Sequence, residues 1–115
     1  MEKFKQVFRG QERAHGCYTK SGVNEKGKHT GDSRIVRLFP QPDSLWEEHI
    51  SGVNSLGIIP INDDNKCQWG CIDIDQYPLD HKKIVSKIRE EKFPLIVCRS
   101  KSGGAHIFSF VKSFI

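Results

Sequence analysis

The run "CQWGCIDID" at residues 67–75 restricts the fold of this chain more than any other stretch. It is largely apolar, yet it carries Asp73 and Asp75 two positions apart near its end. Because side chains alternate across a strand, the two aspartates share one face, and Ile72 and Ile74 share the other. Neighbouring carboxylates repel each other, and burying either one without a partner is costly. The run therefore predicts a strand that packs its isoleucines against a helix and presents its aspartates on an open face.

Helix and strand signals alternate after this strand. Residues 78–93 are charged with an apolar stripe at helical spacing, and Asp80 fits the N-cap position. Residues 94–100 and 106–111 are apolar strands, joined by the glycine-rich link "KSGGA". A strand–helix–strand crossover followed by a hairpin lets the last strand lie antiparallel beside the first strand.

This topology places His106 next to Asp73 and Asp75 on neighbouring strands. We therefore expect an α/β (α+β) fold in which residues 56–115 form a catalytic sheet, the β-α-β-β first half of an RRM-like sheet. Residues 1–55 are expected to form an N-terminal αβ module with a basic loop. With 115 residues, the whole chain is one domain of ordinary size.

The N-terminal half carries weaker secondary-structure signals. Ser44 and Glu47 fit a capping box, and Gly52 follows as a stop signal. The strand expected at 56–61 should form a hairpin with the strand at 67–75. The other segments predicted here are a short helix at 3–10, a long flexible or functional loop at 19–33, a strand at 34–40 and a helix at 42–52.

Composition and charge limit the kinds of partner and the cellular compartment that we expect for this chain. The net charge is +4, and much of the basic excess lies in residues 1–37. This favours a phosphate-bearing partner and ordinary solubility equally. No segment reaches the roughly 18 apolar residues of a membrane span, and the N-terminus has no signal-peptide core. We expect a cytoplasmic protein with no membrane contact, whose four cysteines are free thiols.

The aspartate pair indicates a particular chemistry. Residues two apart on a strand have Cα atoms about 6.5–7 Å apart, which suits two carboxylates that share a divalent cation or a metal pair. Hard cations with oxygen ligands serve phosphoryl and nucleotidyl transfer. Alternatively, both aspartates are simply solvated at a strand end, with Asp75 opening a turn before Tyr77 and Pro78.

The segment "RSKSGGAHIF" at 99–108 adds a second motif. Glycines let a backbone approach a phosphate closely, and successive amides can form an anion nest. The neighbouring serines and Lys101 add donors and a positive charge. The alternative is a hairpin turn followed by a structural histidine. The aspartate pair, helix, strand and this segment together are far more specific than either motif alone.

That combination resembles the archaeo-eukaryotic primase superfamily, the primase-polymerases. Its two motifs match "CIDID" and "SKSGGAHIF", in order and at a suitable separation. Upstream stretches, "FRGQERAHG" and "HISGVNSLGIIPINDDNKCQWGCIDID", are similar to the primase domain of TOTE conflict systems and to related phage or mobile-element primases. The resemblance covers residues 8–110 and is strongest from His49 onward.

The resemblance implies roles for individual residues. Asp73 and Asp75 would hold catalytic Mg²⁺ or Mn²⁺, and His106 would complete the catalytic set by contacting the phosphates of the incoming nucleotide. Arg9 and Arg13 would face template or nucleotide. The nucleoside triphosphate would be cradled by Ser100, Lys101, Ser102, Gly103 and Gly104. The implied partners are nucleoside triphosphates, a single-stranded DNA template, and the remainder of a longer parent protein or a helicase.

Two departures from the family pattern matter. The third acidic motif has no room after Phe110, so we expect a fragment or a truncated remnant that lacks polymerase activity alone. Relatives also often carry a cysteine-rich insert. A zinc site would need the set Cys17, His29, Cys67 and Cys71, and we expect ordinary buried thiols instead.

Three functions follow from these motifs. The leading one is a DNA primase or polymerase-type nucleotidyltransferase that uses two metals, one to activate the 3′-hydroxyl and one to steady the leaving pyrophosphate. The alternatives are a catalytically inactive module that binds nucleotide or single-stranded nucleic acid, and a metal-dependent nuclease that uses the same aspartates.

Overall fold

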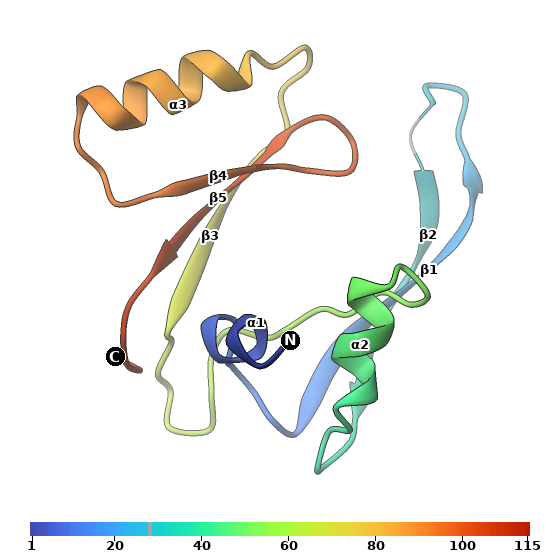
Figure 1. Cartoon of the computed structure of the whole chain (residues 1–115). Coiled ribbons are helices and arrows are strands. Elements are labelled where there is room, and N and C mark those ends of the chain that lie inside the picture. The colour runs from blue at the N-terminus through green and yellow to red at the C-terminus, as the bar shows by residue number, and fades with distance from the viewer. Residues whose placement is uncertain (28) are drawn as a thin grey trace. The chain divides into compact units, whose positions relative to one another are not determined.

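The computed structural model describes residues 1–27 and 29–115. The chain is mixed α+β with two small antiparallel sheets, which confirms the predicted class. It divides into two compact units, one of residues 1–68 with 113–115 and one of residues 69–112 (Figure 1). The sequence-based division at residue 55 stays a prediction.

The N-terminal unit contains two short helices and a two-stranded ribbon. The strands pair antiparallel from Ala14 opposite Arg37 to Val23 opposite His29, with a register shift between Lys20 and Gly22. Trp46 is buried in this unit and meets Phe4 edge-on, with ring centroids 5.7 Å apart. The elements are α1 (Glu2–Val7), β1 (Ala14–Val23), β2 (His29–Arg37) and α2 (Ser44–Ile50).

The ribbon overturns the predicted loop at 19–33. Within the described residues, β1 continues to Val23 and β2 begins at His29, while Lys28 lies outside them. Most of the ribbon is exposed, so its stability comes from backbone pairing rather than from a buried face. The Tyr18 ring also lies close over Gly31, where an added Cβ would meet the ring's Cζ at 2.6 Å. A strand with no buried face leaves no apolar alternation in the sequence to predict it.

The strand predicted at 56–61 is wrong, and so is its hairpin with 67–75. These residues form an isolated bridge between Gly57 and Gly16, and Ile59 accepts one further hydrogen bond from the Gln11 amide. Pro60 has no N–H to donate to a ladder. The capping box is also wrong, because the N-cap of α2 is Asp43 and makes no side-chain capping bond.

The second unit forms a three-stranded sheet in the order β3-β5-β4. Both outer strands run antiparallel to β5 and therefore parallel to each other, as the sequence predicts. The likeness to an RRM-like half-sheet stays a prediction. The elements are β3 (Trp69–Ile74), α3 (His81–Glu90), β4 (Ile96–Arg99) and β5 (Ala105–Phe110).

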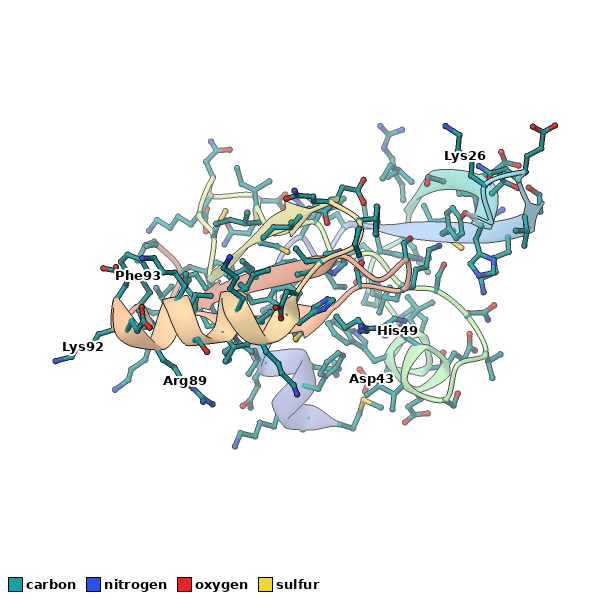
Figure 2. The ribbon with its side chains drawn as sticks, turned by 90° about the horizontal axis from the view of Figure 1, so that it is seen from above. Lys26, Asp43, His49, Arg89, Lys92 and Phe93 are labelled. Atoms are coloured by element: carbon teal, nitrogen blue, oxygen red, sulfur yellow. The ribbon has the colours of Figure 1, made fainter. Side chains whose placement is uncertain are left out.

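Helix α3 begins where the sequence predicts. The Asp80 side chain accepts a hydrogen bond from the Lys83 amide at 3.2 Å, so the predicted N-cap is confirmed. The helix contacts β4. Figure 2 shows the side chains of Arg89, on the helix, and of Lys92, just after it, pointing away from the sheet. Ile72 remains 59% exposed, because β3 is the outer strand at the other edge of the sheet. The prediction that it packs on the helix is therefore wrong.

Candidate nucleotide and metal site

The sheet brings together the first aspartate and the histidine. Asp73 lies directly opposite His106 in the β3–β5 ladder, with its Oδ1 3.5 Å from the imidazole Nε2. Both side chains are substantially exposed, at 63% and 44%. This arrangement confirms the topological prediction for Asp73 and leaves both groups accessible to a solute.

Asp75 is held differently, because β3 ends at Ile74 and the ladder does not reach it. Its Oδ1 accepts a hydrogen bond from the Tyr77 hydroxyl at 2.5 Å. This bond to a carboxylate is the main cause that raises the pKa of Tyr77. Sequence reasoning treated Tyr77 only as part of a turn, and no periodicity or motif singles it out.

The glycine-rich link forms a tight turn against the end of β3. The Gly103 amide donates to the Ser100 carbonyl at 3.1 Å, and the Ser100 amide donates to the Gly104 carbonyl at 3.0 Å. Gly103 has a φ of +95°, which favours glycine. A Cβ on Gly104 would lie 2.3 Å from the Ile74 carbonyl oxygen. The turn therefore abuts the residue just before Asp75.

A histidine that sequence reasoning did not select anchors this turn. The Nε2 of His81, at the start of α3, lies 2.8 Å from the Gly104 carbonyl oxygen. That oxygen already accepts the Ser100 amide, so two groups hold it. Helix, turn and strand end are thereby tied together at one point.

The donor set determines which metals the site suits. Mg²⁺ binds through one or two carboxylates and completes its shell with waters and substrate phosphates. Asp73 and Asp75 supply two carboxylates of the kind that Mg²⁺ or Mn²⁺ would use when delivered with a triphosphate. Across residues 1–27 and 29–115, no group of three or more His, Cys, Asp or Glu is arranged to hold a metal by itself.

The cysteines are free thiols in the described chain. None of them is buried, since Cys71 and Cys98 are exposed and Cys17 and Cys67 half-buried, so the prediction of buried thiols is wrong. Cys71 lies on the same face of β3 as Asp73, two residues before it. Partial burial, and then the charge of Asp73, raise the pKa of Cys71.

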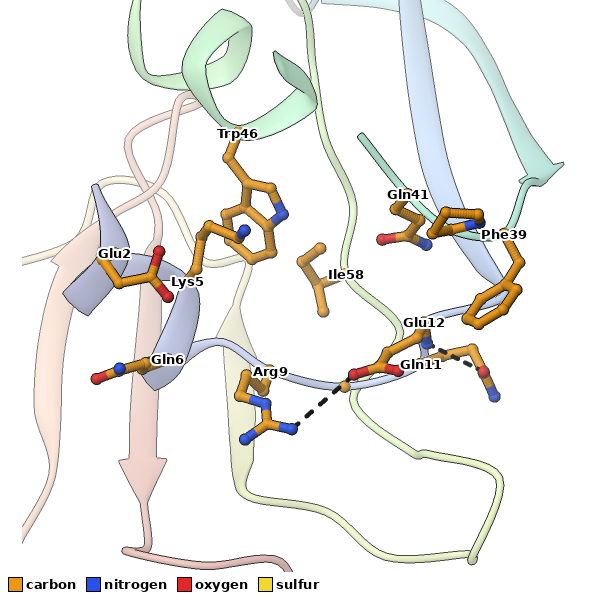
Figure 3. Close-up of a pocket in the computed structure, with 12 residues that line it drawn as sticks. Glu2, Lys5, Gln6, Arg9, Gln11, Glu12, Phe39, Gln41, Trp46 and Ile58 are labelled. Atoms are coloured by element: carbon orange, nitrogen blue, oxygen red, sulfur yellow. Dashed lines mark hydrogen bonds and ion pairs between the residues drawn. The ribbon is translucent and has the colours of Figure 1, made fainter. Parts of the chain in front are cut away.

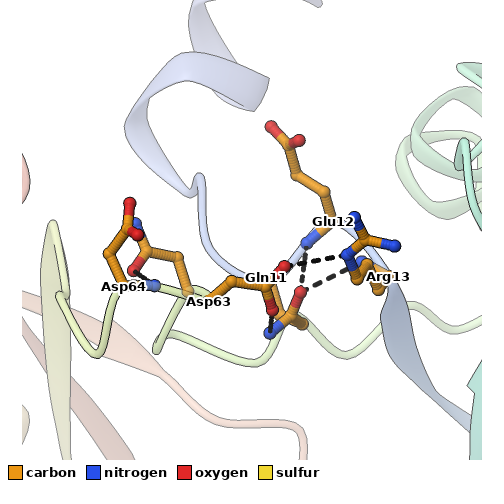
Figure 4. Close-up of polar contacts among 6 residues, drawn as sticks. Gln11, Glu12, Arg13, Asp63 and Asp64 are labelled. Atoms are coloured by element: carbon orange, nitrogen blue, oxygen red, sulfur yellow. Dashed lines mark hydrogen bonds and ion pairs between the residues drawn. The ribbon is translucent and has the colours of Figure 1, made fainter.

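Arg13 lies in the N-terminal unit, where an acidic partner engages it. Its Nε donates to Asp63 Oδ2 at 2.8 Å, and its guanidinium lies 4.7 Å from the centroid of the Phe39 ring. Gln11 donates to the other oxygen of Asp63 at 2.9 Å (Figure 4). The hydrogen bonds from Gln11 and Arg13 lower the pKa of Asp63. Any contact of Arg13 with nucleic acid would have to compete with this pairing.

Arg9 lines a pocket of about 370 Å³ in the same unit (Figure 3). Its Nη2 is 3.9 Å from Glu12 Oε1, and its guanidinium lies 5.6 Å from the Phe114 ring centroid. Trp46 and Lys5 line the pocket as well. The roles of Arg9 and Arg13 toward nucleic acid stay predictions.

The two sheets and the motifs of the second unit have the parts of a primase-type domain: paired carboxylates, a histidine on the neighbouring strand and a glycine-rich turn. The sequence profile of the family described as TOTE conflict system, Archaeo-Eukaryotic Primase domain, matches residues 13–115. The chain therefore belongs to this family, as its motifs predict. A search of curated protein sequences finds no match. None of the helices in the described part of the chain has the length and apolarity to cross a membrane.

Proposed function

We propose that this chain is a primase-polymerase type nucleotidyltransferase domain whose site is formed by Asp73, Asp75 and His106. The observation that carries the proposal is the placement of Asp73 3.5 Å from His106, on strands that both adjoin the glycine-rich turn. Family membership supports a primase-like activity in general. The geometry supports these particular residues.

Each group in the site has a distinct task in this proposal. Asp73 and Asp75 hold Mg²⁺ or Mn²⁺, which when bound would offset phosphate charge and activate the 3′-hydroxyl. The Ser100 and Gly103 amides already donate within the turn. The other amides of residues 100–104 would therefore face the triphosphate, and Lys101 adds positive charge. His106 donates a hydrogen bond from its ring to a phosphate oxygen. The template would be single-stranded DNA, and a helicase or further domain would be the physical partner.

The number of carboxylates in the proposed metal site determines which activity we expect of this chain alone. No third acidic group joins Asp73 and Asp75 within the described residues. Two carboxylates suffice to bind a metal–triphosphate complex, but they give less control of a second cation. We therefore expect the chain to bind triphosphate with Mn²⁺ and to make no measurable primer.

Binding of a fluorescent deoxynucleoside triphosphate to the full chain tests the proposal, with and without Mn²⁺. Asp73→Asn keeps the side-chain shape but removes its charge, so we expect at least about a tenfold loss of affinity. Asp32→Asn makes the same change on the exposed β2 strand and serves as the matched control. Binding that needs no Mn²⁺, or that is equal in both variants, would overturn the proposal.

Two further assays separate the alternative functions. Triphosphate binding without primer synthesis is the result we expect for this chain alone, and an inactive nucleotide-binding module would give the same result. Primer synthesis that Asp73→Asn abolishes would show a complete polymerase. Cleavage of single-stranded DNA with metal but without triphosphate would show a nuclease that uses the same aspartates.

A further inference from the structure

We propose that Tyr77 is a positioning residue that ties Asp75 to the glycine-rich turn and so sets the distance between the metal ligand and the phosphate cradle. This inference rests on the proposed function. It concerns a side chain outside the acidic and glycine-rich motifs.

The need for such a tie follows from where the strand stops. The last pair of the β3–β5 ladder is Ile74 opposite Ala105, so ladder hydrogen bonds do not fix Asp75. An exposed aspartate beyond a strand end samples several rotamers unless another group holds it. The Tyr77 hydroxyl, 2.5 Å from Asp75 Oδ1, supplies that hold.

Tyr77 also reaches the turn. The Ser102 side chain lies close enough to the Tyr77 hydroxyl to lower the pKa of Tyr77 by hydrogen bonding, against the raising effect of Asp75. A phenolic hydroxyl can donate one hydrogen bond and accept another, so it can bridge a carboxylate and a serine. Tyr77 thereby connects the second aspartate of one motif to the middle serine of the other.

The other end of the turn is already fixed. The Gly104 carbonyl accepts the Ser100 amide at 3.0 Å and lies 2.8 Å from the His81 ring nitrogen. Gly104 also packs directly on the Ile74 carbonyl. In this proposal Tyr77 adds a second link between the strand end and the turn, beside the contact of Gly104 with Ile74.

The bond leaves Asp75 able to bind a cation. A carboxylate has two oxygens with about four acceptor sites, and the Tyr77 hydroxyl takes one of them. Partners that orient a metal ligand in this way typically contribute about 10–100-fold to metal affinity or activity. We expect a similar contribution from Tyr77.

The test is Tyr77→Phe in the full chain, which removes one hydroxyl and keeps the ring. We expect Mn²⁺ affinity in the presence of triphosphate, measured by electron paramagnetic resonance of free Mn²⁺, to fall about tenfold. We also expect faster amide hydrogen exchange at residues 100–104. Ser102→Ala, which cuts the tie from the other side, should accelerate the same exchange.

Tyr18→Phe, the same change on β1, is the control and should alter neither quantity. Mn²⁺ binding and turn exchange that are both unchanged in Tyr77→Phe would overturn the inference, while Asp73→Asn could still show the proposed function to be right. A wild-type chain that binds no Mn²⁺ would refute the proposed function and the cation-directed role of Tyr77 with it. Unchanged exchange would then refute the tie as well.

Discussion

Gly104 offers the sharpest test of how the turn is built onto the sheet. It is buried, and an alanine Cβ there would lie 2.3 Å from the Ile74 carbonyl oxygen and 3.2 Å from Ser100 Oγ. Real Cβ atoms essentially never come within 3.0 Å of another heavy atom. The first neighbour is backbone, so it cannot rotate out of the way. Gly104→Ala must therefore push the turn and the end of β3 apart.

The size of the effect follows from this overlap. Relieving it requires the two backbones to separate by at least about 0.7 Å, and overpacking of this kind costs about 1–3 kcal/mol. Taking about 2 kcal/mol and a urea dependence of about 2 kcal/mol per molar, the midpoint of unfolding should fall by about 1 M. The separation would also strain the Gly104 carbonyl's contact with His81.

Urea unfolding followed by far-ultraviolet circular dichroism measures the shift. Gly70→Ala is the matched control, because Gly70 is an exposed strand residue of the same sheet and an added Cβ meets nothing within 4 Å. That variant should be neutral or slightly stabilised, since alanine has less backbone entropy to lose on folding. If the two variants unfold at the same urea concentration, the close packing of the turn on β3 is refuted.

Two further predictions concern the N-terminal unit. Trp46→Ala should lower the free energy of unfolding by about 3–5 kcal/mol, because it empties a buried site against Phe4, whereas the exposed Val53→Ala should cost under about 0.5 kcal/mol in the same urea titration. The pKa of Asp63 is lowered from its ordinary value of 3.8 in the folded chain, so its contribution to stability is fully present above pH 3.8. That contribution is lost as the pH falls through the lower folded-state pKa. The melting temperatures of wild type and Asp63→Asn should therefore differ at about pH 5 and converge toward about pH 2. An equal effect of Trp46→Ala and Val53→Ala, or a constant difference in melting temperature across that range, would contradict these readings.

The second unit was predictable because its signals are local and strong. An apolar run of strand length, an amphipathic helix with Asp80 at its N-cap and two further apolar strands each point to one structure. Connection rules then leave few ways to join them, and the antiparallel neighbour of β3 is β5 as expected. The pairing of Asp73 with His106 follows directly from that order.

The first unit was predicted less well, because the far part of its ribbon, beyond Tyr18, has no buried face. The ribbon of β1 and β2 is mostly exposed, so glycine, lysine and serine occupy positions where a core strand would show alternation. In contrast, "LGIIPI" has a strand-like composition but forms only one bridge, in which Gly57 and Gly16 exchange two backbone hydrogen bonds, and Pro60 cannot donate to extend it. Composition therefore missed the exposed strands of the ribbon and wrongly predicted a strand at 56–61, because strand formation here depends on backbone pairing rather than on burial.

The sequence by itself determined the mixed α+β class, the family and the two motifs, because each depends on residue types at short spacings. Only the tertiary structure decided how the motifs are joined. The contacts of Tyr77 with Asp75 and of His81 with Gly104 link residues whose spacing follows no periodicity. Their partners are set by where β3 stops and how closely Gly104 packs on Ile74, and such distances arise only when the whole sheet has formed.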